Sequence, residues 1–252
     1  TFTEFWQKMI DEGLVATNLT TWSDGWKEAV GEGKIASMFS GAWLPSLLMS
    51  NLPGTAGLWR VAQMPTPDGS YTTSENGGSA LAVLQRSRKP EASYRFIEYA
   101  CHKSEGIKAR VDGGAFPADN NTLSDPEFLR KTTVTDERGI EIPYFGGQEY
   151  NRVLSEAAEN VSTGYQYLPF EVYARSDFRT TVGKAYKWSS LLRKEQNRLN
   201  IIAAGGQVSD TSNIGDALKN TESSDRIKLK GGIALWQKDL KEYGANQGFT
   251  IQ

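Results

Sequence analysis

The stretch GEGKIASMFSGAWLPSLL, residues 31–48, joins a short apolar run to a segment that begins with proline. The run at 35–39 has the length and apolar character of a buried strand. Pro45 suits the first turn of a helix, so a short helix is expected from there to Leu48. Trp43 therefore stands just beyond the carboxyl end of the expected strand. Open α/β sheets bind their ligands at that edge.

Trp43 has two possible roles at this position. Its indole face can stack on the flat apolar side of a sugar ring while the ring N–H stays free to donate. The alternative is a core tryptophan that fills the corner between the strand and the helix. Residue type alone leaves the two roles equally open.

The rest of the chain alternates expected helices with a few expected strands. Apolar runs of strand length lie at 58–62 and 80–84. Helical periodicity predicts helices at 3–12, 23–30, 45–48, 90–102, 104–113, 147–160, 170–200, 213–219 and 224–243. Strands separated by helices favour an α/β fold with a largely parallel sheet. The strands are few for so many helices, which suggests that part of the fold is missing from this sequence.

Three polar residues stand where helices are expected to begin. Ser23 and Ser104 have hydroxyl groups that can cap a helix N-terminus. Asp125 is followed by Pro126, which combines an N-cap with a proline in the first turn. We expect a helix to begin at each of these three places.

Composition limits the classes of partner. The 252 residues are enough for one large domain or two small ones. The 28 basic and 30 acidic side chains nearly balance, so no strong field favours nucleic acid or an anionic membrane. No apolar run of about 18 residues is present for a transmembrane helix. Cys101 is the single cysteine, which rules out an intrachain disulfide, and its helical pattern predicts a buried thiol.

Catalytic and metal-binding patterns are missing from the sequence. His102 is the single histidine, at the expected C-terminal end of a helix, and has no partner at metal-ligand spacing. Nucleophile-elbow, P-loop and dinucleotide patterns are also missing. We therefore expect no catalytic residue, no metal site and no cofactor. One catalytic alternative stays open, because Glu75 and Glu171 can each face a cleft and a carboxylate pair can hydrolyse a glycosidic bond.

Two segments combine aromatic or amide side chains with open backbone. In the first, Asn76 precedes Gly77 and Gly78, and two adjacent glycines let another group approach the main chain closely. In the second, Tyr144 and Phe145 precede another glycine pair. For the first segment the alternative is a plain turn, which local sequence slightly favours, and for the second it is a turn with a packed ring.

A third segment, GYQYLPFEVY at 164–173, brings further aromatics to the start of a helix and ends at Tyr173. The chain as a whole has 7 Trp, 10 Tyr and 10 Phe. Aromatic rings with amide and hydroxyl donors suit neutral polyols better than ions.

Five segments also follow, in order, the pattern of a known family. GEGKIASMFSGAWLP resembles the pattern G-x-x-A-M-x-x-x-G-x-W, with Ala36, Gly41 and Trp43 in place and the methionine shifted to Met38. The other four are Met64-Pro65 with Gly69, the run 76–83, KPEASYRFIEYACHKSEGIKARVDGGAFPA and the final IALWQKDLKEYGANQGF. Together they resemble the family 1 extracellular solute-binding proteins, the carbohydrate receptors of ABC importers related to maltose-binding protein.

The resemblance implies a periplasmic-binding-protein-like fold of type II, in which two α/β lobes close on the ligand by a hinge. Residues 1–79 and 142–252 are then two segments of the C-terminal lobe, and 80–141 is a returning segment of the N-terminal lobe. Family chains are longer and begin with a strand-rich half that has no counterpart before Thr1. We therefore expect a chain truncated at its N-terminus, with apolar surface exposed on 80–141.

The resemblance also implies a function. It predicts a non-enzymatic receptor that binds a sugar or oligosaccharide and delivers it to the permease subunits of an ABC transporter. The expected location is extracytoplasmic, in the periplasm or at the cell surface, where family members are often held by a lipoprotein cysteine. Two alternatives remain, a carbohydrate-active hydrolase with a carboxylate pair and a peptide or polyamine receptor of the same fold. The expected ligand contacts are Trp43, Asn76, Gly77, Gly78, Tyr144, Phe145 and Tyr173.

Overall fold

The computed structural model describes residues 2–17, 19–207 and 228–250. The chain divides into two compact units. The terminal unit combines Thr1–Thr21 with Gln166–Gln252, and the central unit is Trp22–Tyr165. The lobe boundaries expected at 79–80 and 141–142 do not coincide with these units. The expected boundaries concern the two lobes of a longer fold, and the division of this chain between those lobes stays a prediction.

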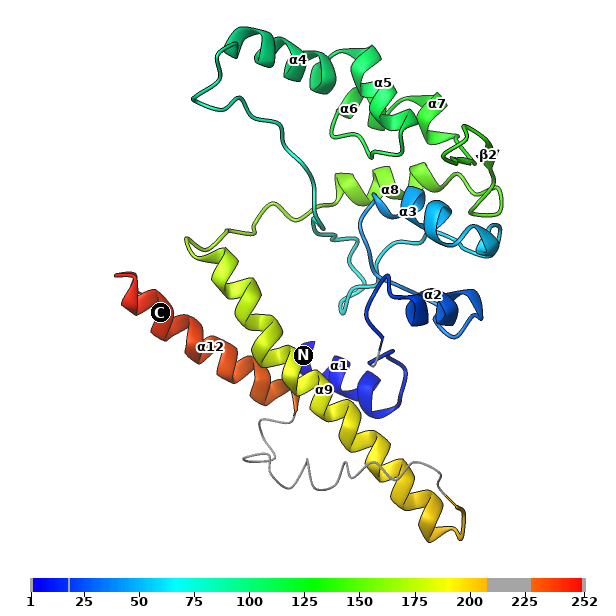
Figure 1. Ribbon diagram of the computed structural model, residues 1–252, viewed down its shortest axis with the longest axis vertical. Coiled ribbons are helices and arrows are strands. Elements are labelled where there is room, and N and C mark those ends of the chain that lie inside the picture. Colours follow the sequence, from blue (N-terminus) through cyan, green and yellow to red (C-terminus); the bar gives the residue numbers. More distant parts are fainter. Residues whose placement is uncertain (1, 18, 208–227, 251–252) are drawn as a thin grey trace. The chain divides into compact units, whose positions relative to one another are not determined.

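The described part of the terminal unit is built from α1 (Phe2–Asp11), α9 (Glu171–Ala203) and α12 (Leu229–Asn246). Helices α9 and α12 lie side by side, and α1 packs against both (Figure 1). A polar contact supports this packing. The Gln7 side-chain oxygen accepts from the Leu229 backbone N–H at 3.0 Å, so α1 supplies a partner to a donor at the start of α12.

The core of the terminal unit follows from helical periodicity in α9. Ala174, Val182 and Ala185 recur on one face of the helix and are all buried. Gly232 of α12 lies against this face, and the ring N–H of Trp236 donates to the Ala174 carbonyl at 2.8 Å. Small residues on both helices therefore let the two backbones approach closely.

The central unit contains shorter elements. In chain order these are α2 (Asp24–Gly31), α3 (Leu44–Asn51), the 3-10 turn η1 (Pro53–Thr55), α4 (Pro90–His102), α5 (Ser104–Asp112), α6 (Asn120–Leu123), α7 (Pro126–Leu129), β1 (Val134–Thr135), β2 (Glu141–Ile142) and α8 (Tyr150–Glu159). Helix α3 contacts β1, α7 contacts α8, and α4 contacts α5. No helix among the described residues combines the length and apolar character needed to cross a membrane.

The expected parallel sheet is not formed by the described residues. The runs at 35–39, 58–62 and 80–84 are not strands. Strand pairing in the described part of the chain is confined to the antiparallel β1–β2 hairpin and one parallel bridge, between Thr73 and Val161. The sequence runs have strand character, but a parallel strand needs another strand beside it to take its backbone hydrogen bonds. The described chain places none beside these runs.

One side chain takes the place of a neighbouring strand. The Gln148 carboxamide accepts from the Val61 backbone N–H at 2.8 Å and donates to the Val61 carbonyl at 2.7 Å. A side-chain amide has the same donor and acceptor as a peptide group, so both backbone groups of Val61 are satisfied. The segment is therefore held extended without a ladder.

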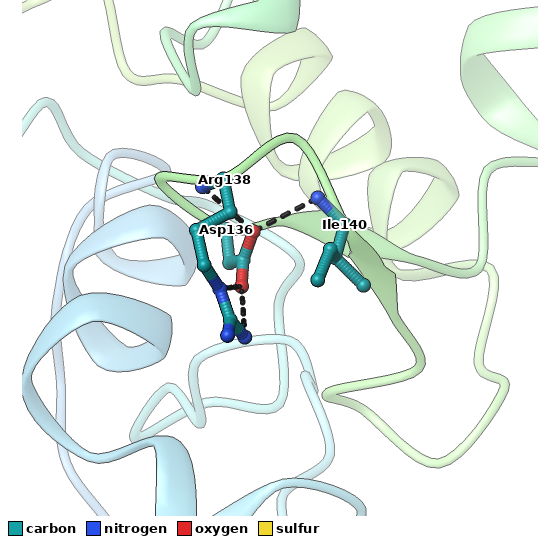
Figure 2. A network of polar contacts seen from close by, with 3 residues as sticks. All are labelled: Asp136, Arg138 and Ile140. Atoms are coloured by element: carbon teal, nitrogen blue, oxygen red, sulfur yellow. Dashed lines mark hydrogen bonds and ion pairs between the residues drawn. The ribbon is translucent and has the colours of Figure 1, made fainter.

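The β1–β2 hairpin is closed by an aspartate (Figure 2). The Asp136 carboxylate accepts from the backbone N–H groups of Arg138 at 2.9 Å and Ile140 at 2.8 Å. The Arg138 guanidinium also donates to it, at 3.1 and 3.0 Å. Gly139 takes the left-handed conformation that the turn requires, with φ of 79°.

The helix predictions are largely confirmed. Elements appear within a few residues of each expected span in the described part of the chain, and the helix expected at 213–219 and the first residues of the helix expected at 224–243 lie outside it. Ser23 caps α2 by accepting from the Trp26 N–H, and Asp125 caps α7. The Ser104 cap was wrong. Lys103, with an extended backbone, is both the C-cap of α4 and the N-cap of α5. Ser104 therefore lies within the first turn of α5.

Helix α4 is more exposed than its sequence pattern predicts. Only Ala100 is buried among its residues, and Cys101 is half-buried rather than buried. Phe96 is 64% exposed, and Leu84 in the preceding segment is 76% exposed. The apolar surface expected on 80–141 is therefore present.

Candidate ligand-binding site

Trp43 lies immediately before α3 in the central unit, with its side chain 37% exposed. Its ring N–H donates to the Asn76 carbonyl at 2.7 Å, which joins two segments 33 residues apart. The expectation of a free ring N–H was wrong, because this bond uses it. The ring is therefore fixed by its edge.

Two glycines, Gly41 and Gly77, lie next to the hydrogen bond between Trp43 and Asn76. A Cβ atom on Gly41 would lie 2.5 Å from the Trp43 Nε1 and 2.7 Å from the Asn76 carbonyl oxygen. A Cβ atom on Gly77 would lie 3.4 Å from the same nitrogen. Gly77 and Gly78 have φ of 97° and 114°, a region that L side chains rarely adopt. The structure thus brings Trp43, Asn76 and Gly77 together, with open backbone next to them at Gly78.

The start of α3 is tied to a second turn of the central unit. The Ser46 hydroxyl lies within hydrogen-bond distance of the Gly114 carbonyl, at 3.4 Å. A Cβ atom on Gly114 would lie 2.7 Å from the Ser46 Cβ, so glycine is needed for this approach. A small pocket here is lined by Ala42, Pro45, Ser46, Asp112, Lys131 and Asn151, among others. Tyr150 also borders it, and burial raises the pKa of its hydroxyl to about 12.

Tyr144 and Phe145 are core residues. The Tyr144 side chain is 0% exposed, and its hydroxyl lies 2.6 Å from the Thr55 hydroxyl. Phe145 is 3% exposed and packs against the rings of Tyr144 and Tyr150, with centroids 5.4 and 5.0 Å away. Neither ring has a face open to a ligand. The structure assigns them a packing role in place of the expected ligand contact.

Tyr173 belongs to the terminal unit, where it lies at the start of α9. Its ring stacks on Tyr243 of α12, with centroids 3.7 Å apart and planes at 7°. It also packs against the buried cluster of Phe170, Ala174 and Leu240. One ring face is therefore covered, and the main contribution of Tyr173 is to join α9 to α12.

Tyr167 is the more exposed aromatic residue of this segment, at 62%. The Arg175 guanidinium lies 5.9 Å from its ring centroid, and the Glu171 carboxylate accepts from the Arg175 Nε at 2.8 Å. The same carboxylate accepts from the Leu168 N–H at 3.3 Å, which holds the loop before α9. Sequence reasoning singled out the segment but chose Tyr173. The position of Tyr167 in the loop, ahead of Pro169, was the available signal for exposure.

The two carboxylates suggested for catalysis belong to different units. Glu75 is exposed in the central unit, whereas Glu171 lies in the terminal unit and pairs with Arg175. Among the residues with described positions, no group of three or more His, Cys, Asp or Glu side chains can hold a metal ion.

No protein-family model matches the chain, and no curated protein matches it. Among solved structures, the chain is similar to an ABC transporter associated binding protein from B. animalis subsp. lactis Bl-04, determined in complex with β-1,6-galactobiose. The two are 43% identical, with a TM-score of 0.75. The match covers 100% of this chain and 52% of that chain, so this chain spans about half the length of the protein it matches.

Proposed function

Since this chain is related along its whole length to a carbohydrate-binding protein of an ABC transporter, we propose that it acts as a sugar-binding receptor of this class. The observation that carries the proposal is 43% identity over 100% of the chain to a protein solved with a disaccharide. The relationship confirms the resemblance that the five sequence segments indicated. Sugar binding and delivery to a permease are the proposed activity of the whole protein.

The proposed contact surface is centred on Trp43. Its ring is exposed at the start of α3, where an indole face can cover the apolar side of a pyranose. The Asn76 carbonyl and Gly77 lie beside the ring edge, and the exposed Asn76 side chain and the backbone of Gly77 and Gly78 can bond to sugar hydroxyl groups. Such a surface needs no acid, base or metal.

The alternatives have less support. A hydrolase needs two carboxylates on one ligand, and the Glu171 carboxylate is already engaged by Arg175 and by the Leu168 N–H. A polyamine receptor needs several carboxylates around a cation, and no group of three or more acidic side chains placed to hold a metal ion occurs in the part of the chain that the structure describes. The related protein is described as a binding protein, which supports a non-enzymatic role.

The proposal extends to location and architecture. We propose an extracytoplasmic receptor that passes its ligand to ABC transporter permease subunits. Its segments at 1–79, 80–141 and 142–252 would contribute to two lobes, as in periplasmic-binding-protein-like folds of type II. The relationship to an ABC transporter associated protein supports each of these points.

Titration calorimetry of the purified protein tests the proposal. The titrants are β-1,6-galactobiose, other disaccharides, galactose, and spermidine as the cationic comparison. Saturable binding of a saccharide is the expected result, and binding of spermidine alone would overturn it. Loss of an aromatic stacking contact should weaken binding about tenfold or more in Trp43→Ala. The exposed Tyr94 of α4 provides the control, and Tyr94→Ala should bind as the unaltered protein does.

Turnover must be measured in the same samples. Prolonged incubation with the bound disaccharide should release no monosaccharide. Stoichiometric binding followed by product release would replace the receptor with the hydrolase.

A further inference from the structure

Trp43 carries both a ring face and a hydrogen-bond donor, and the structure uses the donor internally. The 2.7 Å bond from its Nε1–H to the Asn76 carbonyl is short for an N–H···O bond, which has a usual length of about 2.9 Å. An indole has only this one donor. The ring can therefore offer a ligand its face but no hydrogen bond.

Gly41 makes this bond possible. A Cβ atom at Gly41 would come within 2.5 Å of the Trp43 Nε1, 2.8 Å of its Cδ1 and 2.7 Å of the Asn76 carbonyl oxygen. Real Cβ contacts under 3.0 Å essentially never occur. Gly41 does not have the positive φ of a conformationally required glycine, unlike Gly77. Glycine is therefore needed at position 41 because a side chain there would occupy the space that the edge of the Trp43 indole fills.

We propose that Gly41 is the positioning residue of the Trp43 ring, and that the Trp43–Asn76 bond makes this ring a stacking surface without a donor. This inference rests on the proposed sugar-binding function. Recognition at Trp43 then selects for an apolar patch of C–H groups on the ligand. Selection among hydroxyl groups falls to the neighbouring Asn76 side chain and the Gly77–Gly78 backbone.

The bond also has a consequence for affinity. A ring held before binding loses less side-chain freedom when the ligand arrives, which favours affinity. The bond further links the ring to the backbone at Asn76.

The first arm of the test needs no ligand. Deuterium exchange of the indole N–H groups is followed by ¹⁵N–¹H NMR, with the Trp43 signal assigned from its loss in Trp43→Phe. We expect the Trp43 N–H to exchange slowly, and Gly41→Ala to speed its exchange about fivefold or more, because a bond of about 1 kcal/mol is broken. Gly54→Ala is the matched control, since Gly54 also lacks a positive φ and a Cβ there would meet no described atom within 4 Å.

The second arm measures affinity for the disaccharide that binds best. Gly41→Ala is expected to weaken binding about fivefold to tenfold in the native background. In the Trp43→Phe background the loss of affinity should be smaller, because the Trp43 Nε1 is gone and the clash with the Asn76 carbonyl oxygen is the one that remains. An additional bound-state spectrum should show the Trp43 N–H still protected, since the ligand does not compete for it.

The outcomes separate the two proposals. Unchanged exchange in Gly41→Ala, or an equal loss of affinity in both backgrounds, would overturn the positioning role. A Trp43 N–H that shifts strongly and changes partner on ligand binding would overturn the donor-free stacking surface. A native protein that binds no saccharide would overturn the proposed function, and faster Trp43 N–H exchange in Gly41→Ala would still support the positioning by Gly41.

Discussion

The Tyr144 hydroxyl lies 2.6 Å from the Thr55 hydroxyl, and both side chains are buried. The same tyrosine donates to the Leu52 carbonyl at 2.9 Å, at the end of α3. The Tyr144 hydroxyl oxygen thereby joins Tyr144 to Thr55, 89 positions earlier in the chain, and to Leu52, 92 positions earlier. Burial raises the pKa of the Tyr144 hydroxyl, so it stays protonated and able to donate at neutral pH.

We expect Tyr144→Phe to lower the free energy of unfolding by about 1 kcal/mol, because the buried Thr55 and Leu52 oxygens lose a partner. Ligand affinity should not change, since the ring is fully buried. Urea denaturation followed by circular dichroism measures the first effect, and calorimetry measures the second. Tyr94→Phe in the exposed part of α4 is the control and should stay within about 0.5 kcal/mol of the native value. A loss of ligand affinity in Tyr144→Phe without a loss of stability would contradict the packing role and indicate that Tyr144 contacts the ligand.

Gly232→Ala is expected to destabilise the terminal unit. The new methyl group would lie 2.8 Å from the Ala185 Cβ and 3.1 Å from the Val182 Cα, so α9 and α12 must separate. Overpacking of this kind costs about 1–3 kcal/mol, which exceeds the gain of up to about 1 kcal/mol from replacing a helical glycine.

A second helical glycine provides the matched control for this change. Gly183 of α9 has no described atom within 4 Å of a built Cβ. Gly183→Ala should therefore stabilise the protein by up to about 1 kcal/mol. Urea denaturation of the two variants gives opposite signs if the helix contact is as tight as described, and equal signs would contradict it.

Asp136 makes the stability of the β1–β2 turn depend on pH. Hydrogen bonding from the Ile140 N–H, supported by Arg138, lowers the pKa of its carboxyl group below the usual value for aspartate. A carboxyl group with a lowered folded-state pKa stabilises the protein above its unfolded pKa of about 4 and loses that contribution as the pH falls through the folded value. We therefore expect the native protein to exceed Asp136→Asn in melting temperature at pH 7.

The difference in melting temperature should shrink steadily below about pH 4, as the native carboxyl group becomes protonated. Melting curves of both proteins between pH 7 and pH 2.5 measure it. A difference that is equal at all pH values would show that the carboxylate charge does not stabilise the turn.

Tyr167 and Tyr173 should respond differently to truncation. Tyr173→Ala removes the stacked contact with Tyr243 and is expected to lower stability by about 1–3 kcal/mol, because aromatic pairing adds to burial. Tyr167→Ala should leave stability within about 0.5 kcal/mol, since its ring is 62% exposed. Any contribution of this segment to sugar binding is expected to appear in Tyr167→Ala, measured by calorimetry. An affinity loss confined to Tyr173→Ala, at unchanged stability, would assign the contact to Tyr173.

The helices could be predicted from the sequence because their signals are local. Apolar spacing defined α1 and α9, and Ser23 and Asp125 capped the helices that follow them. A helix satisfies its backbone hydrogen bonds within a few residues, so a short stretch carries the information. The expected parallel sheet failed for the opposite reason, since a strand is satisfied only by another strand elsewhere in the chain.

The candidate site was recognised in part. The order of five motifs indicated a carbohydrate receptor, in agreement with the similarity to an ABC transporter associated binding protein. GAW and NGG were marked as two candidate places, and the structure joins them through the bond from Trp43 to Asn76. The segment at 144–147 has the same local character, yet Tyr144 is buried whereas Trp43 is exposed. Local sequence does not distinguish them, because burial depends on what the rest of the chain places over each ring.

The sequence by itself determined most of the described helical segments, the caps at Ser23 and Asp125, and the resemblance to carbohydrate-binding receptors. Only the tertiary structure showed that the Trp43 N–H is bonded to Asn76, that Gly41 makes room for this bond, and that Tyr173 stacks on Tyr243. Each of these contacts joins different segments of the chain. Periodicity and capping act within a few residues, whereas such contacts depend on how the intervening chain folds back, and no short stretch of sequence contains that information.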